Sequence, residues 1–68
     1  MKLTYDATAR AAYIYLKEDP SPGSVKRTLS SHGSILLDFD ADGKLLGIEI
    51  LDATQLLCDA TLRTAEKT

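Results

Sequence analysis

The sequence predicts a small α+β protein, in which an antiparallel β-meander of about five strands carries one short C-terminal helix packed on the sheet. Apolar and polar side chains alternate through most of residues 1–51, and this period of two is typical of half-buried strands. After residue 52 the apolar spacing changes to that of a helix. With 68 residues and few large apolar side chains, the chain suits a single domain with a thin core.

Two expected strands, residues 2–5 and 11–17, open the chain. The second has the clearest strand pattern, because aliphatic side chains alternate with aromatic ones and both kinds favour strands. Its aromatic residues, Tyr13 and Tyr15, share one face with Lys17. We expect the two tyrosines to pack under the helix or in a contact between subunits.

A loop and a polar strand are expected next. Pro20 and Pro22 each lack the backbone N–H that a strand needs, so residues 19–23 are expected to form a loop. In residues 25–30, Val25, Arg27 and Leu29 alternate with three polar side chains, so the strand is polar and carries charge near its start. This composition suits a strand at the edge of a sheet, where charge blocks unwanted pairing.

Two apolar runs, residues 34–39 and 44–51, flank the turn sequence Asp-Ala-Asp-Gly at residues 40–43 and predict a β-hairpin. A four-residue loop would place the larger apolar side chains of both strands opposite one another on one face. In this register the pairs are Phe39 with Lys44, Leu37 with Leu46, and Ile35 with Ile48.

The other face of the hairpin also carries leucines, at positions 36, 45 and 51, and such a face needs cover. The C-terminal segment is the expected source of that cover. Residues 53–62 predict a short helix, with Asp52 as the N-cap and Gln55 completing a capping box, followed by a frayed tail at residues 63–68. The apolar stripe of this helix consists of Ala53, Leu56, Leu57 and Ala60.

The acidic turn has the spacing of a calcium-binding EF-hand loop, with Glu49 six residues after Gly43. An EF-hand needs helices on both sides of its loop, whereas strands are expected here. We therefore interpret the Asp and Gly residues as turn chemistry and expect no metal or other cofactor. The alternative is a small-molecule or metal-binding domain that uses this turn, with Asp38, Asp40 and Asp42 as candidate ligands.

Composition argues against several classes of protein. Eight basic and ten acidic residues give a net charge of −2 and a pI near 5.1, which disfavours nucleic-acid binding. No apolar run is long enough for a membrane span or a secretion signal. The single cysteine, Cys58, allows no internal disulfide, fits a reducing cytoplasm, and is expected in the core or at an interface. No catalytic motif is present, so we expect no enzyme.

Three stretches of the sequence resemble the family of domains of unknown function numbered 2283. They are the N-terminal Met-Lys-Leu-Thr-Tyr-Asp, the Ala-Tyr-Ile-Tyr-Leu of the second strand, and residues 38–53 with their Gly-Ile-Glu-Ile-Leu stretch. The resemblance covers roughly residues 1–54. It implies a compact, sheet-rich domain without an established activity, and it points to an antitoxin-like role beside a small protein partner.

Self-association is the main functional expectation. A sheet with apolar side chains on both faces has more apolar surface than one short helix can cover, and small chains gain stability by dimerising. We therefore expect a non-catalytic interaction module that forms a homodimer. The expected contact combines the helix with exposed sheet residues, namely Tyr13, Tyr15, Leu36, Leu45, Leu56 and Leu57.

Overall fold

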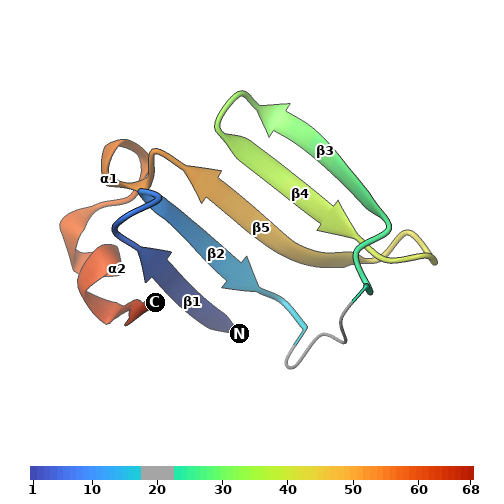
Figure 1. The fold of residues 1–68 in the computed structure, drawn as a ribbon, viewed down its shortest axis with the longest axis horizontal. Coiled ribbons are helices and arrows are strands. Elements are labelled where there is room, and N and C mark those ends of the chain that lie inside the picture. The colour runs from blue at the N-terminus through green and yellow to red at the C-terminus, as the bar shows by residue number, and fades with distance from the viewer. Residues whose placement is uncertain (18–22) are drawn as a thin grey trace.

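Six β-strands form one sheet in the computed structural model, which describes residues 1–17 and 23–68. Their order across the sheet is β3–β4–β5–β2–β1–β6, and among these pairings only that of β1 with β6 is parallel (Figure 1). Two short helices lie between β5 and β6 in the chain. The elements are Lys2–Asp6 (β1), Ala11–Tyr15 (β2), Arg27–His32 (β3), Ile35–Phe39 (β4), Leu45–Leu51 (β5), Ala53–Leu56 (α1), Asp59–Thr64 (α2) and Glu66–Lys67 (β6).

The predicted α+β class with a small meander is confirmed. Strands β3, β4 and β5 follow one another as antiparallel neighbours, while β1 and β2 form a separate hairpin. The two units join because β2 pairs with β5, so that β3 lies at the far edge of the sheet. The predicted loop at residues 19–23 lies outside the described residues, except for Gly23.

The hairpin between β4 and β5 forms at the predicted place, but its loop is one residue shorter than predicted. The Asp40 N–H donates to the Lys44 carbonyl at 2.9 Å, so three residues rather than four form the loop. Gly43 closes the loop with a φ of 77°, a left-handed conformation that glycine adopts without steric penalty. The predicted pairing of Phe39 with Lys44 is therefore wrong.

A second irregularity lies between Asp38 and Phe39, where β5 contributes one extra residue. Together with the shorter loop, it moves the register by two residues from the prediction. Because side chains alternate along a strand with a period of two, this shift keeps the inner residues of both strands on their predicted faces. The pairs that replace the predicted ones are Ile35 with Ile50 and Leu37 with Ile48.

The C-terminal segment forms two helices and a strand, where one helix and a frayed tail were expected. Between the helices, Leu57 and Cys58 are extended, with ψ angles of 139° and 158°. This break allows Leu57 and Leu62 to contact one apolar cluster, whereas in a continuous helix residues five apart would point about 140° apart. The tail is ordered because residues 66–68 find backbone partners along the open edge of β1.

The predicted capping box at the start of α1 is also wrong. Asp52 occupies the N-cap position with a left-handed backbone, at a φ of 55°, and its side chain makes no capping hydrogen bond. Backbone groups replace it, since the Ala53 N–H donates to the Arg10 carbonyl at 3.0 Å. Within the described part of the chain, no helix has the length and apolar character needed to cross a membrane.

The core is small and lies at the end of the sheet where the helices are (Figure 1). Its buried members are Ala12, Ile50 and Ala53, with exposed fractions of 1%, 5% and 0%. Leu57 and Leu62 pack against it from the helices. The helices therefore contact the face that carries Ile50, and the prediction that they cover the opposite face is wrong. Figure 1 shows no helix beside β3 and β4 in the described residues.

Candidate functional site

Cross-strand pairing divides the sheet residues into two faces of different chemistry. The first, which we call the isoleucine face, has an aliphatic row across five strands, with two further residues beside it: Leu3, Ile14, Ile48, Leu37 and Leu29, then Ile35 and Ile50. The second, which we call the tyrosine face, has two mixed rows. One row consists of Lys2, Tyr15, Gly47, Asp38 and Thr28, and the other of Thr4, Tyr13, Glu49, Leu36 and Ser30.

A hydrogen-bonded bridge links residues of β2, β4 and β3 on the tyrosine face and passes over β5. The Tyr13 hydroxyl on β2 donates to Asp38 Oδ2 on β4 at 2.6 Å, and Thr28 Oγ1 on β3 donates to Asp38 Oδ1 at 2.7 Å. The Tyr13 ring passes over Gly47 on the intervening strand, where any β-carbon would overlap with the ring. The glycine inside a strand is the sequence signal for this close approach, although it does not name the partner.

The Tyr13 hydroxyl keeps its proton over the whole physiological range. Partial burial raises the pKa of this hydroxyl well above its usual value, and the hydrogen bond to Asp38 raises it further. The nearby Asp38 charge acts in the same direction, because it disfavours a second negative charge. Tyr13 is therefore a permanent hydrogen-bond donor at neutral pH, and Asp38 is its acceptor.

The second tyrosine of this face stacks beside the first. The Tyr13 and Tyr15 ring centroids are 4.6 Å apart with their planes tilted by 55°. The Lys2 ammonium lies 5.8 Å from the Tyr15 ring centroid and 3.2 Å from the Glu66 carboxylate on β6. The result is an aromatic pair on a sheet face that no helix of the described chain covers.

Glu49 lies at the centre of the tyrosine face and differs from Asp38 in its surroundings. Its cross-strand neighbours are Tyr13 and Leu36, and it is half-buried between them. Across residues 1–17 and 23–68, its carboxylate accepts no hydrogen bond and forms no ion pair. Neither oxygen of this carboxylate is buried, so both can accept a hydrogen bond from water or from another molecule.

The structure separates the residues that were expected to form one contact. Tyr13, Tyr15 and Leu36 lie together on the tyrosine face. Leu57 packs on the core from the other side of the sheet, and Leu56 projects from α1 with 46% of its surface exposed. Leu45 is an exposed residue at the irregularity of β5. A single flat contact cannot include all six residues, because they belong to two opposite faces.

The acidic turn uses its carboxylates for its own backbone. Asp40 Oδ1 accepts hydrogen bonds from the N–H groups of Asp42 and Lys44, both at 2.9 Å. Asp38 is directed onto the tyrosine face instead. In the part of the chain that the structure describes, no group of three metal-ligating side chains comes together. The interpretation of this segment as turn chemistry therefore accounts for Asp40.

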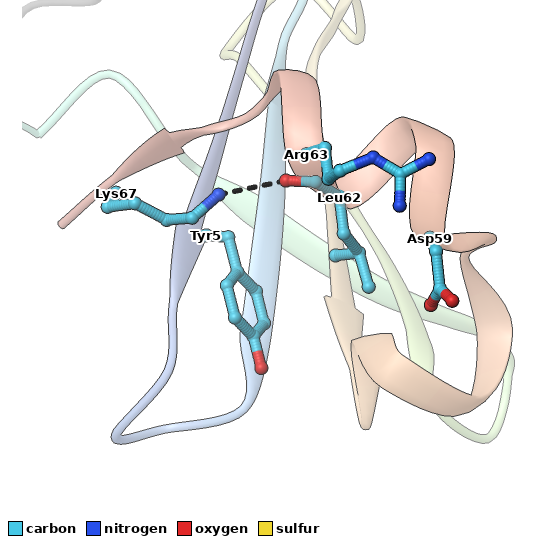
Figure 2. A pocket seen from close by; sticks show the side chains of 5 residues that line it. All are labelled: Tyr5, Asp59, Leu62, Arg63 and Lys67. Atoms are coloured by element: carbon cyan, nitrogen blue, oxygen red, sulfur yellow. Dashed lines mark hydrogen bonds between the residues drawn. The ribbon is translucent and has the colours of Figure 1, made fainter.

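A shallow pocket of about 260 Å³ lies where α2 and β6 meet β1. Figure 2 shows its lining residues, which are Tyr5, Asp59, Leu62, Arg63 and Lys67. The Lys67 ammonium donates to the Leu62 carbonyl at 2.9 Å and to the Ala65 carbonyl at 3.2 Å, and it lies 5.9 Å from the Tyr5 ring centroid. Lys67 thus supplies hydrogen bonds to two backbone carbonyls at the C-terminal end of α2. The sequence pattern gives no sign of this pocket, because it predicts a frayed tail at residues 63–68.

Cys58 is exposed, so its expected place in the core is wrong. It begins α2 between two helices, with its sulfur 3.2 Å from Thr61 Oγ1. The hydrogen bond with the Thr61 side chain lowers the pKa of the thiol. No second cysteine is present in the sequence, so this thiol has no partner for an internal disulfide.

Comparison with known families identifies the sheet as the shared part of this chain. The family model described as "Protein of unknown function (DUF2283)" matches residues 2–53. This range includes β1 to β5, and with them both rows of the tyrosine face, whereas α2 and β6 lie beyond it. Neither the curated proteins nor the solved structures contain a significant match. On the strength of a match over more than half of its length, the chain belongs to the DUF2283 family.

Proposed function

We propose that this protein is a non-catalytic interaction module that forms a homodimer through its isoleucine face. The observation that supports this proposal is the small extent of the core. Among the described residues, the buried apolar side chains are Ala12, Leu46, Ile50, Ala53 and Ala65. Three of these five are alanines, and no large side chain in residues 1–17 and 23–68 is less than 2% exposed. A chain of this size gains stability by burying further apolar surface against another molecule.

The isoleucine face offers that surface. Leu29 at its β3 end is 42% exposed, and Ile35, Leu37 and Ile48 are only half-buried. The helices cover only its other end. A second sheet packs face to face at about 10 Å, so a second copy would cover the part of the face that the helices leave open.

A second copy suits this face because its central row is uncharged, and its charged residues, Arg27 and Lys67, lie on the two edge strands β3 and β6. The central row contains five aliphatic side chains and no charge. Two such rows brought together by a two-fold axis would bury no unpaired charge. The tyrosine face, in contrast, has two acidic residues in its central rows, Asp38 and Glu49, and two copies that met there would bring these like charges together.

Light scattering over a dilution series tests the dimer, and two neighbouring substitutions test the face. Leu29→Glu places a charge on the isoleucine face at an exposed edge position, where the fold tolerates it. Ser30→Glu introduces the same side chain one residue later, on the tyrosine face. We expect a dimer for the wild type and Ser30→Glu at tens of micromolar, and a monomer for Leu29→Glu. A wild-type monomer would contradict the proposal.

An antitoxin-like role is a narrower form of this proposal, because it adds a small toxin-like protein as partner. Cytoplasmic localisation belongs to the same proposal and is supported by the exposed thiol of Cys58, since thiols stay reduced in that compartment. Purification of the protein from its native cells tests both ideas. One small protein retained in stoichiometric amount would support the antitoxin-like role, and loss of the reduced thiol would argue against the cytoplasm.

A further inference from the structure

The tyrosine face is acidic as well as aromatic. Among the paired strand positions of this face, Lys2 is the one basic residue, and the acidic residues are Asp6, Asp38, Glu49 and Glu66. The ion pair of Lys2 with Glu66 neutralises one edge of the face. Asp6 accepts hydrogen bonds from the N–H groups of the following turn, at Thr8 and Ala9. The centre of the face therefore keeps two negative charges, those of Asp38 and Glu49.

These two central carboxylates differ in the hydrogen-bond donors that the protein supplies to them. Asp38 receives one hydroxyl donor on each oxygen, from Tyr13 and Thr28. Glu49 has the same half-buried setting but no donor from the described residues. A carboxylate without a donor from its own chain can form a charge-assisted hydrogen bond with a donor that arrives with a binding partner. The face thus has one carboxylate that the protein itself hydrogen-bonds, Asp38, and one that can accept a donor from a partner, Glu49.

We propose that the tyrosine face binds an arginine-bearing segment of another protein, with a guanidinium group paired to Glu49 and stacked on the Tyr13–Tyr15 ring pair. Arginine fits both halves of this site, because its planar group forms two parallel hydrogen bonds to a carboxylate and also stacks on aromatic rings. Tyr13 is the direct cross-strand neighbour of Glu49, so both contacts are available to one side chain. Its hydrogen bond to Asp38 holds the ring in place before the partner binds.

Other occupants fit this face less well. A second copy would oppose its own acidic residues, and nucleic acid would bring phosphates to the same negative surface. The proposal is independent of the homodimer, because it concerns the opposite face of the sheet. It can therefore be tested on the wild type and on the Leu29→Glu variant alike.

An NMR titration with a short peptide of alternating arginine and threonine tests the proposal. The control peptide replaces each arginine by citrulline, which keeps the shape and removes the charge. We expect amide shift changes at Tyr13, Gly47 and Glu49 with the arginine peptide, in both protein backgrounds, and none with the citrulline peptide. Equal shifts with both peptides, or shifts confined to the turn at residues 40–43, would overturn the proposal.

Two charge-neutralising substitutions separate a specific site from general attraction. Glu49→Gln should weaken binding of the arginine peptide at least about tenfold, since it removes the paired charge and keeps the shape. Asp59→Asn changes the net charge equally but lies on α2, and it should change the affinity less than about twofold. Equal weakening by both variants would overturn the proposal. So would a loss of dimers in Glu49→Gln, because it would assign the tyrosine face to a second copy.

Discussion

The two faces of the sheet are built from the same strands but are stabilised in different ways. The isoleucine face consists of aliphatic side chains that gain free energy only when something covers them. The tyrosine face satisfies part of its polar groups itself, through the bridge from Tyr13 to Asp38 and Thr28. An uncovered aliphatic face favours a permanent contact. A polar face whose hydrogen bonds are partly made within the protein can be exposed to water between encounters with a partner.

The largest effect is expected from removing a buried side chain of the isoleucine face. Ile50→Ala should reduce the free energy of unfolding by about 3 kcal/mol, because Ile50 is 5% exposed and belongs to the core cluster. Leu51→Ala is the matched control, since the next residue points to the tyrosine face and is 39% exposed. It should lose less than about 1 kcal/mol. Urea denaturation measures both, and equal losses would show that the faces do not differ in burial.

Gly47→Ala should have the next largest effect, a loss of about 1–2 kcal/mol. The added methyl group would force the Tyr13 ring away and break its hydrogen bond to Asp38. In a Tyr13→Ala background the overlap disappears, and the same substitution should stabilise the strand, because alanine loses less entropy than glycine on folding. A double-mutant cycle by urea denaturation measures the sign change. The same loss in both backgrounds would mean that the ring does not occupy this space.

Tyr13→Phe isolates the hydroxyl of the bridge and should cost about 1 kcal/mol at neutral pH. The folded protein raises the pKa of this hydroxyl, so its stabilising effect is present below about pH 10 and is lost as the pH rises above that value. The wild type should therefore lose more stability than Tyr13→Phe in alkaline solution. Unfolding midpoints from neutral to strongly alkaline pH check this, and parallel curves for the two proteins would argue against a proton held in the bridge.

The smallest effect is expected at the edge of the tyrosine face. Lys2→Met removes the ion pair with Glu66, whose two side chains are 55% and 64% exposed. Exposed ion pairs contribute little, so the free energy of unfolding should change by less than about 0.5 kcal/mol. Thermal unfolding at low and high salt measures it. A loss above about 1 kcal/mol would show that this edge stabilises the sheet more than its exposure indicates.

The division into two faces could be predicted from the sequence, because it depends only on the alternation of side chains. The register could not be predicted, since it depends on a loop of three residues and on an extra residue in β5, and local composition fixes neither. The same limit applies to the bridge, because Gly47 indicates a close approach but Tyr13 reaches Asp38 across a strand that separates them. Strand β6 was missed because two residues cannot show a period, and only the open edge of β1 selects them.

An isotope-filtered NMR experiment on a mixed sample tests whether a second copy covers the isoleucine face. One copy carries labelled methyl groups and the other does not, so contacts between copies are detected selectively. We expect contacts between copies at the methyl groups of Leu29, Leu37 and Ile48. Contacts from Leu36 and Leu51 instead, or no contacts between copies at tens of micromolar protein, would contradict this expectation.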